Sequence, residues 1–99
     1  MLTIAAGVAG DTLTITLRGD LDLSNCLRLP ETVREHATPA VIVIDLAGVD
    51  FCDSSGLGVL VQLHKAAERE GRRLVLRAPT LNVRRLFDVA GLSDVFVVE

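Results

Sequence analysis

Apolar and polar side chains alternate near the start of the chain. Leu13, Ile15 and Leu17 are separated by single threonines, which is the two-residue period of a strand with one buried and one polar face. A turn signal at 9–11 precedes this run. We therefore expect residues 2–8 to form the preceding edge strand of a hairpin.

The second half of the chain predicts alternating strands and helices. The continuous β-branched run Val41–Ile44 predicts a central strand covered on both faces. Asp53 precedes the most regular helical pattern, which ends near Gly71. Beyond it the pattern indicates a short strand over 74–76, a helix between Thr80 and Gly91, and a last strand over 95–98.

The segment 24–37 is the least regular part of the pattern. Its apolar residues favour a helix, but Pro30 lacks a backbone N–H and breaks a helical ladder anywhere beyond the first turn. We expect this helix to begin near Pro30 or to be kinked there.

This order of elements predicts an α/β protein with one domain spanning residues 1–99. Alternating elements give right-handed crossovers and a largely parallel sheet, here with an antiparallel hairpin in front. We expect a mixed, mostly parallel sheet of about four or five strands with three helices. A chain of this length has room for one core.

Composition excludes several partner classes. The net charge is -3 and the chain has three Phe but no Trp or Tyr, so a basic stripe and stacking platforms for nucleic acid are not expected. The phenylalanines fall inside apolar patterns. No basic leader and no apolar run of about 18 residues is present, which predicts a cytoplasmic protein without a membrane partner.

The cysteines and histidines do not predict a reactive centre. Cys26 and Cys52 form no CxxC pair or Cys/His cluster, so we expect reduced thiols, no metal and no cofactor. His64 lies on the apolar side of its helix and is expected to be a packed or partly exposed side chain, not a ligand. Neither it nor His36 has an evident pairing with Ser54.

The octet Phe51–Gly58 carries the most distinctive chemistry. It joins the central strand to the best helix, where Asp53 can cap free N–H groups and Ser54 is left exposed in the first turn. Two glycines there lower the helix propensity of the first turn. Because glycine has no side chain, their presence indicates close approach of another backbone or a ligand.

The octet alone is also typical of an ordinary cap and turn, and that interpretation is the more common one. It is neither a G-x-S-x-G nucleophile motif nor a phosphate loop, so no enzyme is indicated. Asp20 and Asp22 likewise fit a solvated turn. Arg84 and Arg85 are able to meet an acidic partner, although a solvated helix face is the simpler interpretation.

Taken together, two blocks resemble STAS domains of bacterial anti-sigma factor antagonists. They are Asp53-Ser54-Ser55-Gly56-Leu57-Gly58 and Arg85-Leu86-Phe87-Asp88-Val89-Ala90-Gly91-Leu92, preceded by Gly19-Asp20-Leu21-Asp22 and the central strand. The resemblance covers nearly the whole chain. It implies a STAS fold.

The resemblance also implies a switch. The unphosphorylated protein is expected to bind an anti-sigma factor serine kinase and release a sigma factor, and phosphorylation of Ser54 is expected to end that complex. The resemblance further implies that a PP2C-type phosphatase resets the switch and that ATP is bound by the kinase, not by this chain. The expected partner-binding residues are Asp20, Asp22, Asp53, Ser54, Ser55, Gly56 and Leu57.

Two departures from the family pattern affect the expected assembly. The chain stops after its last expected strand, without the C-terminal helix of many relatives, and Pro30 disturbs the first helix. We expect a monomer or a weak dimer. The alternative function is a STAS adaptor subunit of a larger complex, such as a lipid transporter, without phosphorylation.

Overall fold

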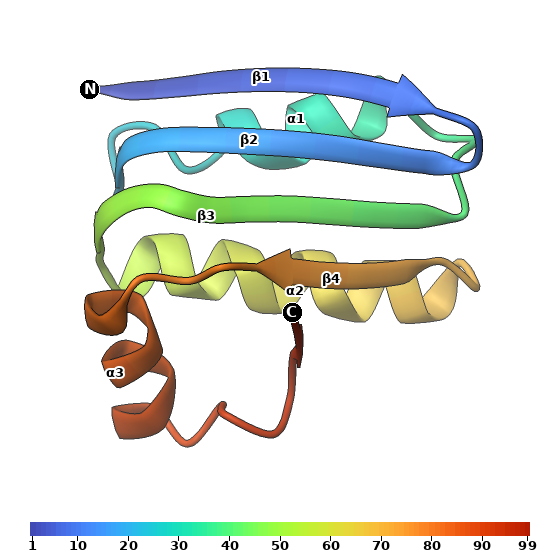
Figure 1. Cartoon of the computed structure of the whole chain (residues 1–99). Helices are drawn as coiled ribbons and strands as arrows, with labels where there is room; N and C mark the ends of the chain where they lie inside the picture. The colour runs from blue at the N-terminus through green and yellow to red at the C-terminus, as the bar shows by residue number, and fades with distance from the viewer.

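The computed structural model describes residues 1–99 as two layers, a five-stranded sheet and two helices against one of its faces (Figure 1). The elements are β1 (Leu2–Ala9), β2 (Thr12–Leu21), α1 (Arg28–Arg34), β3 (Val41–Cys52), α2 (Ser54–Arg69), β4 (Arg73–Arg77), α3 (Leu81–Val89) and β5 (Val97–Val98). The strands lie in sequence order, with β1 antiparallel to β2 and every later pair parallel. The predicted fold class is confirmed.

The alternating side chains of β2 and β3 build the core against α1 and α2. Leu13 pairs in register with Ile42 and Ile15 with Ile44, and all four side chains are buried in the same core cluster as Leu60 of α2. Complete burial of one such side chain is worth about 1.5–3 kcal/mol. Burial of this stripe therefore contributes to holding the helices on the sheet.

The opposite face of the sheet carries no helix (Figure 1). Val43 and Val75 are buried there but lie outside the main core cluster. Val43 is in register with Thr14 and Val75, so side chains of neighbouring strands cover it. The prediction that Val41–Ile44 is covered by other layers on both faces is wrong for this face.

β3 is longer than its apolar run because it contains two irregularities. The register with β2 shifts between Thr16 and Arg18 and again between Gly19 and Asp20. Each shift places an extra residue in β3, as in a β-bulge. Buried positions therefore change from every second residue to every third along Leu46, Val49 and Cys52. The second half of β3 consequently lacks the two-residue alternation that predicts a strand.

The helix boundaries agree with their signals. Pro30 is the third residue of α1, within the first turn, where its missing N–H removes no helical hydrogen bond. Asp53 caps α2 and Thr80 caps α3. Gly71 follows α2 with a positive φ of 69°, the usual helix-ending conformation.

The predicted strand over 95–98 is wrong in its first half. Phe96 leaves the sheet and packs against Phe87 and the edge of His64, with ring centroids 5.1 and 5.7 Å apart. Only Val97–Val98 pairs with β4. His64 is mostly buried through this contact, as predicted.

Candidate functional site

The candidate site lies where β2 and β3 end side by side. Parallel strands end at the same edge of a sheet, and Leu21 is in register with Cys52. The loop leading to α1 and the first turn of α2 start directly beyond these residues (Figure 1). The predicted residues Asp20 and Asp22 are therefore brought close to Asp53.

Asp53 joins the two loops through its carboxylate. Oδ1 accepts a hydrogen bond from the Gly56 N–H at 2.9 Å, and Oδ2 accepts one from the Leu23 N–H at 3.2 Å. Its own N–H donates to the Leu21 carbonyl at 3.2 Å. The predicted helix cap is present, and the same side chain also fixes the neighbouring loop.

The loop after β2 is a hydrogen-bonded turn. The Asp22 carboxylate accepts from the N–H of Ser24 at 3.0 Å and from its hydroxyl, while the Asn25 amide donates to the Asp20 carbonyl at 2.9 Å. The Asp20 carboxylate takes part in none of these bonds. Of the two acids, Asp22 shapes the turn and Asp20 leaves its charge available.

Gly56 is the tightest contact of the site. A Cβ there would lie 2.6 Å from the Leu21 carbonyl oxygen and 2.9 Å from the Cys52 sulfur, whereas one at Gly58 would meet nothing within 4 Å. Close approach of a backbone, expected from the glycines, is thus found at Gly56. Gly56 and Leu57 are both buried, so these two predicted partner-binding residues face the interior.

Ser54 is the first residue of α2 and is exposed, while Ser55 is half-buried. The Ser54 hydroxyl makes no hydrogen bond within the chain, whereas the N–H groups of Gly56 and Leu57 later in the first turn donate to Asp53. Each histidine has other neighbours: His36 Nδ1 lies 2.9 Å from the Thr32 carbonyl and His64 Nε2 lies 3.3 Å from Glu68. Neither histidine is therefore positioned to activate Ser54 as a nucleophile.

Cys52 is chemically quiet although it adjoins the site. Burial raises the pKa of its thiol to about 12 from 9.0, and the charges of Asp53 and Cys26 act in the same direction. The reactive form of a cysteine is the thiolate. Both cysteines are buried, and neither forms a disulfide.

Exposed apolar side chains beside the site were missed by the sequence pattern. Leu23, in the loop after β2, is 76% exposed, and Phe51, next to the last residue of β3, is 53% exposed. Phe51 reaches the surface because the second irregularity of β3 falls next to it. It also lines a shallow pocket with Cys52, Asn82, Arg85, Leu86 and Val89.

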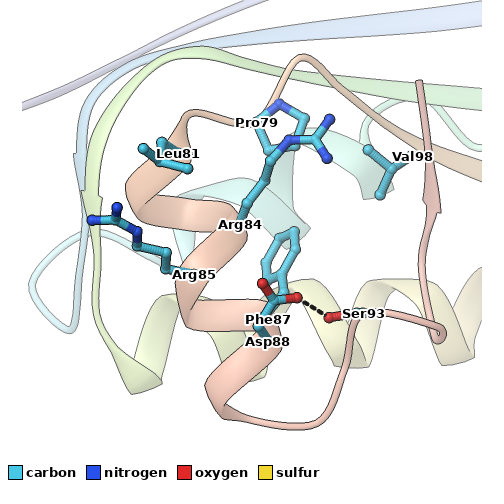
Figure 2. A pocket seen from close by; sticks show the side chains of 8 residues that line it. All are labelled: Pro79, Leu81, Arg84, Arg85, Phe87, Asp88, Ser93 and Val98. Atoms are coloured by element: carbon cyan, nitrogen blue, oxygen red, sulfur yellow. Dashed lines mark hydrogen bonds between the residues drawn. The ribbon is translucent and has the colours of Figure 1, made fainter.

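A second pocket lies between α3 and the C-terminal segment (Figure 2). Arg84 points from α3 toward Pro79, Arg85 points to the other side of the helix, and the Asp88 carboxylate accepts a hydrogen bond from the Ser93 hydroxyl. This pocket contains none of the predicted partner-binding residues. Both arginines are exposed, as expected of a solvated helix face.

Together these features define a small α/β binding domain with an exposed serine at a helix start. The family described as "Mlab, STAS domain" matches residues 4–99, and the chain belongs to the STAS domain family. None of its helices is long and apolar enough to cross a membrane.

Comparison with known proteins agrees with this family. The chain is 32% identical over 91 residues to the anti-sigma-B factor antagonist of Listeria monocytogenes, covering 90% of this chain and 80% of that one. It resembles the anti-sigma factor antagonist SpoIIAA in its unphosphorylated form, with a TM-score of 0.82 and 22% identity over 98% of this chain and 88% of that one. The phosphorylated form of SpoIIAA from Bacillus aligns with a TM-score of 0.76, 21% identity and coverages of 98% and 91%.

The glycine pair supplies a test of the site's packing. We predict that Gly56→Ala lowers the free energy of unfolding by about 1–3 kcal/mol, because the new methyl overlaps the Leu21 carbonyl. Gly58→Ala, in open space on the same helix, should raise it by up to about 1 kcal/mol through helix propensity. Urea unfolding measures both, and equal effects of the two changes would contradict the proposed contact.

The raised pKa of Cys52 predicts slow alkylation in the folded protein. A shift from 9.0 to about 12 lowers the thiolate fraction at pH 8 by about a thousandfold. Labelling by iodoacetamide should therefore be very slow at pH 8, rise as the pH approaches 12, and become fast at pH 8 in urea. Peptide mass mapping follows Cys52 itself, and folded-state labelling as fast as in urea would contradict this prediction.

Proposed function

We propose that this protein is an anti-sigma factor antagonist. While Ser54 is unphosphorylated, the protein binds an anti-sigma factor serine kinase and so releases a sigma factor. Phosphorylation of Ser54 ends that complex. The observation that carries the proposal is the exposed, unbonded Ser54 hydroxyl at the start of a 16-residue helix, beside the acidic loop. The names of the curated relatives support the same function.

The partner would contact the surface formed by Asp20, Asp22, Asp53, Ser54 and Ser55. Three carboxylates at the adjoining carboxyl ends of β2 and β3 favour a basic patch on the partner. Exposed Leu23 and Phe51 lie at the same strand ends and offer apolar contacts, which often dominate the affinity of an interface. The buried residues Gly56 and Leu57 would act by holding Ser54 in place.

Phosphorylation would act locally. The kinase would transfer the γ-phosphoryl group of its own ATP to the Ser54 oxygen, releasing ADP, while the hydroxyl proton passes to a base of the kinase. The phosphate adds about -1.5 to -2 charges at the start of α2. The positive end of the helix dipole stabilises these charges, but the neighbouring Asp53 carboxylate repels them. The domain would stay folded while the contact surface becomes bulkier and more acidic. A PP2C-type phosphatase would hydrolyse the ester and restore the hydroxyl.

Phosphate transfer to Ser54 is the direct test. We expect incubation with a serine kinase of the anti-sigma type from the same genome and Mg-ATP to add one phosphate, mapped to Ser54 by peptide mass spectrometry. Ser54→Ala should add none, and Ser55→Ala should behave as wild type because Ser55 is half-buried.

An unmodified chain in the presence of a kinase shown to be active would contradict the switch. That outcome would favour the alternative, an adaptor subunit of a larger complex, in which Ser54 is only a helix start. Phosphate on Ser55 in place of Ser54 would retain a switch but show that the acceptor is misassigned.

Charge at position 54 should separate binding from folding. We expect Ser54→Asp to weaken binding to the same kinase by about a hundredfold, since the new carboxylate adds to the acidic surface. Its thermal unfolding should match wild type, because an acid at a helix N-terminus is not destabilising. Calorimetric titration and circular dichroism measure the two effects, and wild-type affinity in a folded variant would contradict the local mechanism.

A further inference from the structure

β1 leaves one edge of the sheet open along its whole length. It pairs only with β2, in a regular antiparallel register from Leu2 to Ala9. The strand is exposed from Ala5 to Ala9, and Figure 1 shows nothing beyond its outer edge. Its backbone N–H and C=O groups on that side are therefore available for another strand.

This edge lacks the features that usually prevent strand pairing. Natural edges carry charged side chains, proline or a bulge. The first ten residues contain no Asp, Glu, Lys, Arg or Pro, and the register of β1 with β2 has no shift. Gly7 has no neighbour within 4 Å of a Cβ position, so the strand is also sterically open.

The charges of α1 indicate which strand fits this edge. α1 lies behind β1, and the groove between them is lined by Ile4, Ala6, Arg28, Glu31, Thr32, Glu35 and His36. Arg28 is at the Leu2 end, where its guanidinium donates to the Leu2 carbonyl at 2.8 Å. Glu35 is at the opposite end of the helix.

We propose that β1 pairs antiparallel with β1 of a second copy of this chain. A two-fold axis perpendicular to the sheet and passing near Ala5 or Ala6 keeps the helices of both copies on one face. It brings Leu2 of one copy near Val8 of the other, and hence Arg28 near Glu35 of the second copy. These two groove-lining charges of α1 are complementary under this operation, whereas Arg34 lies on the side of α1 that faces α2.

The resulting dimer is weak and leaves the Ser54 surface free. One strand edge and one short helix form an interface at the low end of the usual size range. Ser54 belongs to the carboxyl edge of β3, two strands away from the β1 edge. The inference does not depend on the proposed switch.

Sedimentation velocity between about 10 µM and about 1 mM tests the pairing. The wild type should change with concentration from a 10.6 kDa monomer to a dimer. Ala5→Lys places two like charges opposite each other or one pair apart on the same sheet face, and should raise the dissociation constant at least about tenfold. Ala90→Lys, with the same charge change at the end of α3, should dimerise as wild type.

Charge reversal tests the geometry itself. Glu35→Arg should weaken dimerisation by opposing Arg28 of the second copy, and Arg28→Glu combined with Glu35→Arg should recover most of it. A wild type that remains monomeric at about 1 mM overturns the proposal. Equal weakening by Ala5→Lys and Ala90→Lys also overturns it, because the effect would then come from net charge alone.

Discussion

The site depends on the close approach of the first turn of α2 to the end of β2. Gly56 permits that approach because a side chain there would overlap the Leu21 carbonyl. Asp53 then uses both carboxylate oxygens, one for the helix and one for the loop after β2. The exposure of Ser54 follows from these contacts. Asp53 and Gly56 face the end of β2, so Ser54, which lies between them in the first turn, faces the solvent.

The irregular part of β3 gives the same region its apolar contacts. A strand that alternated regularly would have kept two-residue spacing through to its end. Two extra residues shift the pattern, so that Val49 and Cys52 remain buried while Asp50 and Phe51 both reach the surface. β-Bulges commonly redirect side chains near functional sites. Here the outward turn of Phe51 brings an aromatic ring beside Asn82, Arg85 and Leu86 of α3.

Sequence reasoning succeeded where a local signal has one structural meaning. Asp53, Gly71 and Thr80 mark helix ends through hydrogen bonds or a backbone conformation that few other residues provide. It failed where the outcome depends on distant packing. Phe96 is β-compatible in sequence but is drawn from the strand by Phe87 and His64, and the exposure of Phe51 depends on its register with β2. The distinct environments of Gly56 and Gly58 were equally inaccessible, because only the fold places Leu21 against one of them.

The separation of the two surfaces has a physical basis in the order of the sheet. The strands lie in sequence order, so β1 is the edge and β3 is the centre, and the loop bearing Ser54 leaves from the carboxyl end of that central strand. A phosphate on Ser54 interacts with the dipole of α2 and with Asp53, effects that are screened within about 8–10 Å in physiological salt. Contacts along β1 involve backbone groups and the charges of α1 at the other side of β2. Pairing of two copies would therefore place two Ser54 surfaces in one dimer without changing the chemistry of either. Any regulation between the two surfaces would require a movement of β2, which is hydrogen-bonded to a neighbouring strand on each side.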